Sequence, residues 1–168
     1  MADVKLVYGS WAAVTISLAS LATSSTFVAG RESTAIDNTS LLALDYLLSV
    51  EKITVGTTPT AGTEIRVYVA GLVGSAVWPD VLDGTDSAET FTTASILDSS
   101  CVLAGRMVCS ATTSNVAFPF HPISVASLFG GVCPSKFVVF VAHNTGVNLN
   151  STAGNHVINV LPIYETVT

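Results

Sequence analysis

The sequence predicts an all-β protein, an antiparallel β-sandwich of jelly-roll type with about eight or nine strands. Three observations support this prediction. Short apolar stretches rich in Val, Ile and Thr recur along the chain, separated by turn residues. Residues 64–73 alternate apolar and polar side chains, which is typical of a strand with one buried face. The spacing of the elements also leaves no room for crossover helices, so a parallel sheet is disfavoured.

The two clearest strand candidates lie near the C-terminus. Segments 137–142 and 157–163 are apolar and rich in β-branched residues, and the polar residues 143–156 separate them. We expect two long strands folded back on each other as a hairpin. Because such a hairpin is apolar, a second sheet has to cover it.

The N-terminal half contains five further candidates. Residues 12–18 alternate Val14, Ile16 and Leu18 with Thr and Ser, which indicates one buried face. Segment 41–55 also fits a helical face, but its β-formers run directly into the turn-rich residues 56–64, so we prefer a long strand. We expect strands over residues 4–8, 12–18, 26–29, 41–55 and 64–73, a loop or extended arm over 19–25, and a loop over 30–40.

The following part of the chain begins with residues 74–95, the longest stretch without a strand or helix pattern. Loops of this length in compact domains are usually binding loops or lids. The sequence FPFHP at 118–122 places two prolines where a central strand would not tolerate them, so it marks an edge or a corner. We also expect 96–98 to lead into a strand over 101–111 with a bulge or bend at Gly105, a continuation of the apolar pattern over 116–120, one helical turn or short strand over 124–129, and a break at 130–131.

Composition indicates one domain with a partly covered surface. The chain has 168 residues, 49% hydrophobic and only 11% charged. That balance disfavours a disordered chain. It also suggests that copies of the protein cover part of one another. We expect residues 1–25 to form N-terminal strands or an arm involved in assembly, and residues 26–168 to form the sandwich.

The charge pattern disfavours nucleic acid as a partner. The formal net charge is −6, and the six basic residues are scattered singly, so no positive stripe exists to follow phosphates. The N-terminus lacks the basic and apolar regions of a signal peptide. The longest apolar run, 137–142, is too short to span a bilayer. We therefore expect no membrane partner.

Three cysteines, Cys101, Cys109 and Cys133, form no CxxC pair and no even framework. On one continuous strand Cys101 and Cys109 are too far apart for a disulfide, although a turn at residues 104–105 could bring them together. We expect buried, reduced thiols, consistent with assembly in a reducing cytoplasm.

Two groups of residues resemble metal ligands. The acidic ladder Asp80, Asp83, Asp86 and Glu89 could supply oxygen ligands to Ca²⁺, but its spacing is not that of an EF-hand loop. A solvated loop is the preferred interpretation. His143 and His156 could face each other across a hairpin and hold Zn²⁺, yet no third ligand is evident. We interpret both as structural residues and expect no bound metal.

Nothing in the sequence predicts an enzyme. There is no G-x-S-x-G elbow and no phosphate-binding glycine loop. We expect no catalytic residues and no cofactor. Aromatic residues at strand ends and in loops are better candidates for an interface, because they combine apolar area with a polar group. These candidates are Tyr8, Trp11, and Trp78 with its neighbour Pro79; the alternative for Trp78 is a lid folded over the sandwich edge.

Three stretches, 18–40, 45–71 and 118–157, together resemble small β-rich structural proteins of tailed bacteriophages, of the capsid-decoration or minor-capsid type. The matching motifs are a GREST-like stretch at 30–34, a PxSVAxxFGGVxP-like stretch at 122–134 and a TGGNH-like stretch at 152–156. Ile123 stands where Phe is expected, and Ala153 replaces a glycine. The resemblance covers most of the chain but carries over no catalytic residue.

The resemblance implies a virion structural protein. The first hypothesis is a capsid decoration, or cement, protein that forms a homotrimer on the capsid exterior and bridges major capsid protein subunits. Residues 1–25 and 74–95 are its expected contacts. Alternatives are a tail or head–tail connector component present in few copies, and a carbohydrate-binding module for host adhesion that uses Trp78 and the acidic loop.

Overall fold

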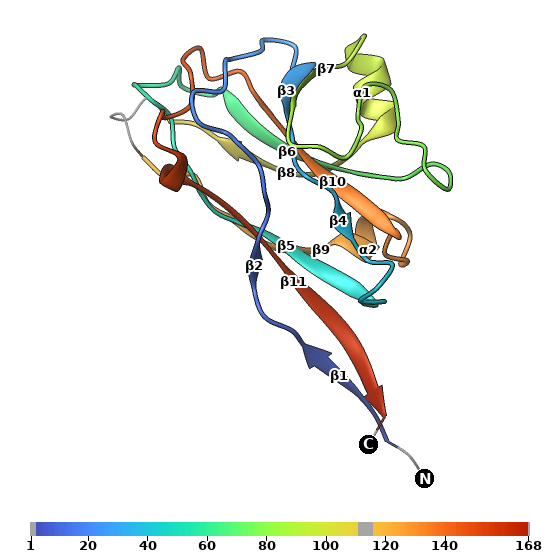
Figure 1. Ribbon diagram of the computed structural model, residues 1–168. Helices are drawn as coiled ribbons and strands as arrows, with labels where there is room; N and C mark the ends of the chain where they lie inside the picture. The colour runs from blue at the N-terminus through green and yellow to red at the C-terminus, as the bar shows by residue number, and fades with distance from the viewer. Residues whose placement is uncertain (1–2, 111–115, 168) are drawn as a thin grey trace.

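The computed structural model describes residues 3–110 and 116–167. These residues form two antiparallel sheets that face each other, together with three short helices (Figure 1). The all-β prediction is confirmed, and the described residues form more strands than expected. The first sheet contains β1 (Val4–Tyr8), β2 (Ala12–Ala13), β5 (Asp45–Ile53), β9 (Phe120–Ser124) and β11 (His156–Val167). The second contains β3 (Ala29–Glu32), β4 (Ile36–Asp37), β6 (Glu64–Gly71), β7 (Ala88–Thr90), β8 (Val102–Val108) and β10 (Lys136–His143).

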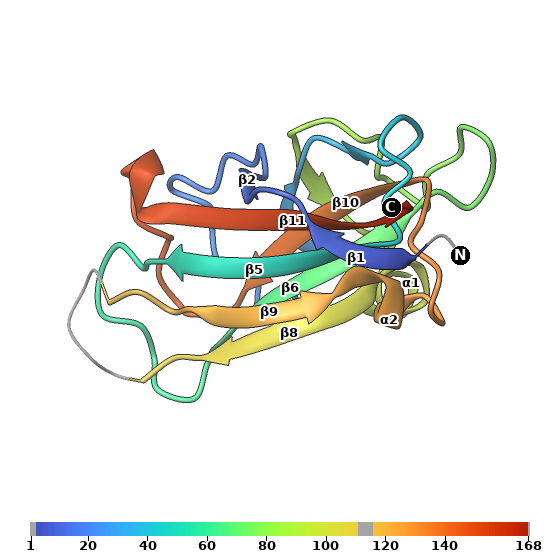
Figure 2. The same cartoon turned by 90° about the horizontal axis from the view of Figure 1, so that it is seen from below.

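Each sheet draws strands from both halves of the chain. The order is β1-β11-β5-β9 in the first sheet, where β2 also pairs with β11. In the second sheet the order is β7-β3-β10-β6-β8, where β4 also pairs with β10. Seen from below, the edge strands β8 and β9 run beside each other and bring the two sheets together on that side (Figure 2).

The expected C-terminal hairpin is wrong. β10 pairs with β3, β4 and β6 in the second sheet, whereas β11 pairs with β1, β2 and β5 in the first. The residues between them therefore pass from one sheet to the other. A hairpin needs a tight connection, commonly of two residues, and the long polar stretch here leaves the chain free to change sheets.

β10 is apolar along its whole length because both of its faces are covered. Phe137, Val139 and Val141 point into the core between the two sheets. Val138 and Phe140 belong to a second apolar cluster on the other face of the second sheet. That cluster also contains Phe91 and residues of α1 (Ala94–Ser100), which lies over this face (Figure 1). Strands buried on both faces read as continuous apolar runs.

Two stretches expected to be loops contain regular structure. Residues 30–40 include most of β3 and all of β4, and residues 74–95 include β7 and the start of α1. The hydroxyl of Thr93 caps α1 by accepting a hydrogen bond from the Ile96 N–H at 3.2 Å. Residues 96–98 therefore lie in a helix. The strand expected at 26–29 begins only at Ala29.

Two predicted strands are shorter than expected. Segment 41–55 becomes a strand at Asp45, and Leu42 before it has a positive φ of 49° that a strand does not allow. Over 12–18 only Ala12–Ala13 pair as a strand, although Val14 and Leu18 are buried as the alternation predicted. Other details are confirmed. β9 lies at a sheet edge, the register of β8 shifts beside Gly105, and a short helix, α2 (Val125–Leu128), follows β9.

Candidate interaction surface

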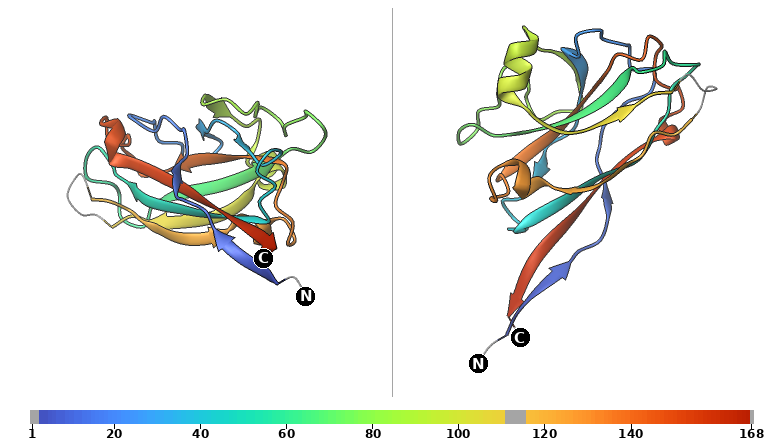
Figure 3. Two further views of the ribbon diagram at one scale, coloured as in Figure 1. Left: turned by 60° about the horizontal axis from the view of Figure 1, so that its bottom comes forward. Right: turned by 180° about the vertical axis from the view of Figure 1, so that it is seen from behind.

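A two-stranded ribbon extends away from the body of the sandwich (Figures 1 and 3). It consists of β1 and the C-terminal half of β11, paired from Val4 opposite Val167 to Tyr8 opposite Ile163. All five residues of β1 are exposed. Both described ends of the chain lie at the tip of this ribbon. Two strands without a layer over them bury little apolar area, so the exposed side chains of this ribbon form a candidate surface for contact with another molecule.

The apolar side chains of the ribbon are concentrated on one face. Val4, Leu6 and Tyr8 alternate along β1, and their exposed fractions are 62%, 63% and 64%. On β11, the half-buried Ile163 and the exposed Val167 lie directly across from Tyr8 and Val4, so they share that face, and the exposed Glu165 lies between them, opposite Leu6. The exposed apolar side chains of β1 therefore make this face a candidate interaction surface.

Trp11 continues the exposed aromatic surface toward the body, where a shallow depression of about 310 Å³ is lined by Trp11, Ser49, Glu51 and Asn159. Trp11 is 48% exposed. Ser49 and Asn159 pair across β5 and β11, and the Asn159 side-chain amide lies 3.4 Å from the Glu51 carboxylate. An uncovered indole therefore stands beside polar groups that can donate and accept hydrogen bonds.

The four aromatic and proline candidates lie in two different places. Tyr8 and Trp11 are exposed along the first sheet. Trp78 packs against the second apolar cluster, and Pro79 is buried. Gly84, with φ of +83°, lies against the indole of Trp78, where a Cβ would approach the ring nitrogen to 3.0 Å. Trp78 therefore resembles the lid alternative.

The four acidic candidates have separate partners. Asp86 accepts hydrogen bonds from the Arg31 guanidinium at 2.6 Å and the Ser17 hydroxyl at 2.6 Å. Asp83 accepts from the Thr85 hydroxyl. Asp80 accepts from the Thr92 N–H, and Glu89 accepts from the Ser87 hydroxyl. Within residues 3–110 and 116–167, no group of three or more His, Cys, Asp or Glu side chains is arranged to hold a metal ion.

One buried acidic residue was missed by sequence reasoning. The Glu32 side chain on β3 is fully buried, and its carboxylate accepts backbone hydrogen bonds from Gly84 at 2.7 Å and Asp83 at 3.1 Å. Burial raises the pKa of Glu32 to about 7, partly opposed by these two hydrogen bonds. A single glutamate between Arg and Ser gives no signal for such a role.

The two histidines bond different parts of the backbone. His143 is fully buried; its Nε2 lies 3.1 Å from the Leu21 carbonyl and its Nδ1 lies 3.0 Å from the Thr145 hydroxyl. The backbone carbonyl of His143 accepts from the Ser24 N–H. His143 thereby fastens residues 21–24 to the end of β10. His156 bonds the Asn150 carbonyl at 2.8 Å. Burial lowers the pKa of both histidines.

The three cysteines are free thiols. Cys101 and Cys109 are buried and Cys133 is half-buried. β8 runs without a turn through residues 104–105, so the alternative that brings Cys101 to Cys109 is wrong. Burial raises the pKa of Cys101 to about 12, which makes its thiol unreactive near neutral pH.

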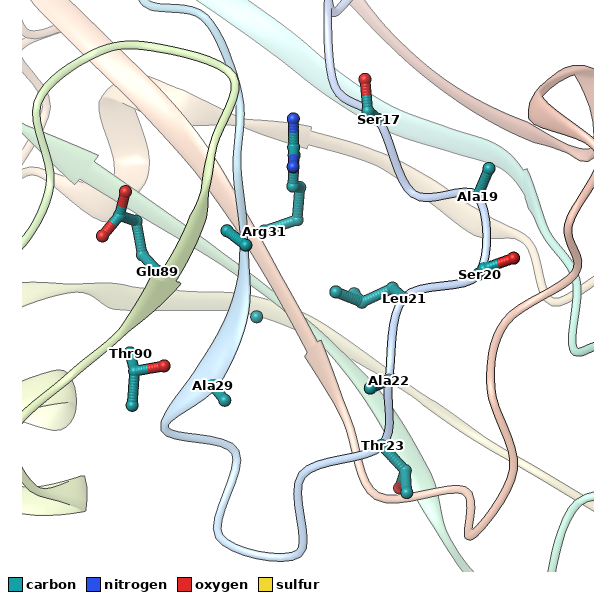
Figure 4. A pocket seen from close by; sticks show the side chains of 12 residues that line it. Ser17, Ala19, Ser20, Leu21, Ala22, Thr23, Ala29, Arg31, Glu89 and Thr90 are labelled. Atoms are coloured by element: carbon teal, nitrogen blue, oxygen red, sulfur yellow. The ribbon is translucent and has the colours of Figure 1, made fainter.

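A groove of about 340 Å³ separates residues 17–23 from β3 and β7 (Figure 4). Its walls are mainly small residues, and its charged side chains are Arg31 and Glu89. Arg31 is already paired with Asp86, so its charge is largely compensated. The groove therefore offers few uncompensated polar or charged groups that could bind a particular ligand.

No family model matches the sequence, and neither the curated proteins nor the solved structures contain a match to it. In the described part of the chain, none of the helices is long and apolar enough to cross a membrane.

Proposed function

We propose that this protein is a structural component of a tailed-phage virion: a capsid decoration protein that assembles with copies of itself, as a homotrimer, on the exterior of the head. It would bridge major capsid protein subunits after assembly in the host cytoplasm. Many weak contacts, repeated over a shell, add up through multivalency. Such a role requires complementary surfaces and no catalytic group.

The observation that carries this proposal is the projecting ribbon. On its apolar face Val4, Leu6, Tyr8 and Val167 are all exposed in the described chain, and Ile163 beside them is half-buried. A side-chain arrangement of this kind suits a protein that completes its packing on neighbouring molecules. The division into an assembly arm at 1–25 and a sandwich at 26–168 remains part of the proposal.

The strand order supports the jelly-roll form of the sandwich. Without the three short strands β2, β4 and β7, eight strands remain, in the orders β1-β11-β5-β9 and β3-β10-β6-β8. Two four-stranded sheets interleaved in this way correspond to two Greek keys, an architecture found in viral capsid domains and also in lectins and cupins. Because one fold hosts many functions, this support is an analogy.

Two of the three motifs that resemble phage structural proteins lie mainly at turns and strand ends, whereas the motif at 30–34 begins within β3. Residues 122–134 run from β9 through α2 to a turn where Gly130 and Gly131 have φ of +74° and +98°. Residues 152–156 include the 3₁₀ helix η1 (Ala153–Asn155) before β11. Motifs in such places shape the scaffold, which fits a structural rather than a catalytic role.

The first test is the copy number in purified particles. We expect quantitative mass spectrometry of virions that contain this protein to find hundreds of copies per particle, and image reconstruction to place them on the head. A few copies at the vertex or along the tail would instead support the tail or connector alternative. Absence from washed particles would contradict the proposal.

A second candidate function, carbohydrate binding for host adhesion, is favoured by the depression at Trp11. An exposed indole can stack on a sugar ring while Glu51, Asn159 and Ser49 bond its hydroxyls. If the protein binds glycans on an array, Trp11→Ala should reduce that binding at least about tenfold, which corresponds to about 1.4 kcal/mol. Trp78→Ala is the matched control, because Trp78 packs against the apolar cluster. Equal losses in both variants would contradict a site at Trp11.

A further inference from the structure

The outer edge of β1 has backbone groups without partners in the described chain. The Gly9 N–H donates to the Pro162 carbonyl at 2.8 Å, so Gly9 turns its backbone groups toward β11. On the other side of β11, the Leu44 N–H donates to the Ile163 carbonyl at 2.8 Å. The backbone groups of Ile163 therefore point away from Tyr8, the residue opposite it on β1. Because backbone groups alternate along an antiparallel pair, Val4, Leu6 and Tyr8 direct their N–H and C=O groups away from β11. β1 ends the strand order of its sheet.

The same three residues have the exposed apolar side chains described above. Unpaired N–H and C=O groups in a row form a template for another strand. A partner that satisfies the backbone groups of Val4, Leu6 and Tyr8 and also covers their side chains is therefore an extended backbone with apolar side chains at alternate positions. This combination indicates a strand as the partner, rather than a helix or a small molecule.

We infer that β1 pairs in antiparallel fashion with β1 of a second copy, about a twofold axis at Leu6. In this register Leu6 lies opposite Leu6 of the second copy, and Val4 lies opposite Tyr8. Val4, Leu6 and Tyr8 then each exchange two backbone hydrogen bonds with the residue opposite in the second copy, so the antiparallel pair contains six such bonds. The apolar side chains of both strands come together on one face.

Lys5 selects this register. Sliding the strands by two residues in one direction places Lys5 directly opposite Lys5 of the second copy, and like charges in that position are destabilising. Sliding by two residues in the other direction leaves Val4 beyond the paired segment. In the inferred register Lys5 faces Val7. The strand is therefore complementary to itself, which favours a second copy over an unrelated strand.

A twofold contact of this kind has a consequence for assembly. An isologous interface uses the same surface on both subunits, whereas the contacts within a threefold ring join two different surfaces. Pairing through β1 would thus join two rings, or form a dimer, and would leave other surfaces for trimer contacts. The inference does not depend on the proposed role in the virion.

Opposite charges at position 6 test the pairing. The full-length chain should self-associate in sedimentation velocity over a concentration series. Leu6→Glu and Leu6→Lys each place two like charges on the twofold axis, so association of either variant alone should weaken, by at least about tenfold for Leu6→Glu, whose charge also lies opposite Glu165 of its own chain. A one-to-one mixture of the two variants should associate again. The matched control is Leu103→Glu on β8, another exposed edge-strand leucine at 43% exposure, which should associate like the wild type.

Cysteine cross-linking gives a second measurement that does not require the charged variants to fold. In a Cys133→Ser background, Leu6→Cys should form an intermolecular disulfide under mild oxidation, since opposed residues of this type have Cα atoms about 5.5 Å apart. Leu103→Cys should cross-link far less. A monomeric wild type together with equal cross-linking at both positions would overturn the inference and point to another protein's strand at this edge. Self-pairing without capsid binding would instead contradict only the proposed function.

Discussion

Replacing Phe140 by alanine is expected to lower the free energy of unfolding by about 3–5 kcal/mol, a large part of the stability of a typical domain. The Phe140 side chain is fully buried. Its ring packs edge-on against Phe91 with centroids 5.2 Å apart and lies 6.2 Å from the ring of Tyr68. Gly30 of β3 has no room for a side chain because the Val141 carbonyl oxygen and the same ring lie against it. Removing the ring would leave a cavity that these neighbours cannot fill.

Urea unfolding followed by circular dichroism measures this loss. Phe137→Ala is the matched comparison, because Phe137 is equally buried but points to the opposite face of β10, toward Tyr46. Similar losses in the two variants are expected, since both faces of β10 support packed clusters. Leu42→Ala, at a residue 75% exposed, should change stability by less than about 0.5 kcal/mol. A loss below about 1 kcal/mol for Phe140→Ala would mean that the layer beyond the second sheet contributes little.

The apolar segments were visible in the sequence, but their pairing was not. Segment 137–142 is continuously apolar rather than alternating, and this signal indicates a strand covered on both faces. The hairpin interpretation used only the nearness of the next apolar segment. Which sheet each strand joins depends on contacts between residues far apart in sequence, such as Phe140 opposite Tyr68 and Glu32.

β3 shows why other elements were missed. Its residues, Ala29 to Glu32, are poor β-formers, so the propensities indicated a loop. Tertiary contacts hold this strand in place: Gly30 makes room for the Phe140 ring, Arg31 pairs with Asp86, and Glu32 binds the backbone of residues 83–84. None of these contacts can be read from local sequence. α1 was missed for a related reason, because seven residues are too few to show helical periodicity.

The candidate surface was predictable in kind but not in arrangement. Tyr8 and Trp11 were recognised as aromatic residues at strand ends, and the structure leaves both exposed. The ribbon was not predictable, because it depends on β11 continuing to Val167 and pairing with β1 beyond the body of the sandwich. Residues 1–25 were expected to make assembly contacts, but Val4 and Leu6 were not singled out within them, and their exposure in the structure distinguishes them.

Glu32 should make the stability of this protein fall as the pH rises from about 5 to about 8. Its pKa is raised from the ordinary value of 4.5 to about 7 in the folded state, mainly by burial. The folded protein therefore holds a proton that the unfolded chain has released over this range, so the free energy of unfolding decreases with increasing pH. Above about pH 7 the full cost of a buried carboxylate applies, on the order of 3 kcal/mol for a shift of this size.

The test measures the free energy of unfolding of the wild type and of Glu32→Gln in urea at several pH values and takes the difference between the two proteins. This difference is needed because His143 and His156 act in the opposite direction: their pKa values are lowered on folding, so their contribution to stability grows as the pH rises through about 6.5. Both variants contain the same histidines, and their effect cancels. Glu32→Gln should thus gain stability relative to the wild type between pH 5 and pH 8. This trend holds even if the substitution itself changes the free energy of unfolding by a constant amount at all pH values. Glu165→Gln, at an exposed position on the ribbon, is the matched control and should follow the wild type.

Hydrogen exchange of backbone amides tests whether the effect of Glu32 is confined to the loop that its carboxylate binds. The Glu32 carboxylate accepts the N–H groups of Asp83 and Gly84, so it holds the loop that also positions Trp78 over the second apolar cluster. In Glu32→Gln one of the two acceptor oxygens becomes an amide that cannot accept a hydrogen bond. Exchange at Asp83 or Gly84 should therefore be faster in the variant, while that of β11 should be unchanged. A parallel pH dependence in the two proteins, with equal protection of this loop, would show that Glu32 does not titrate between pH 5 and pH 8.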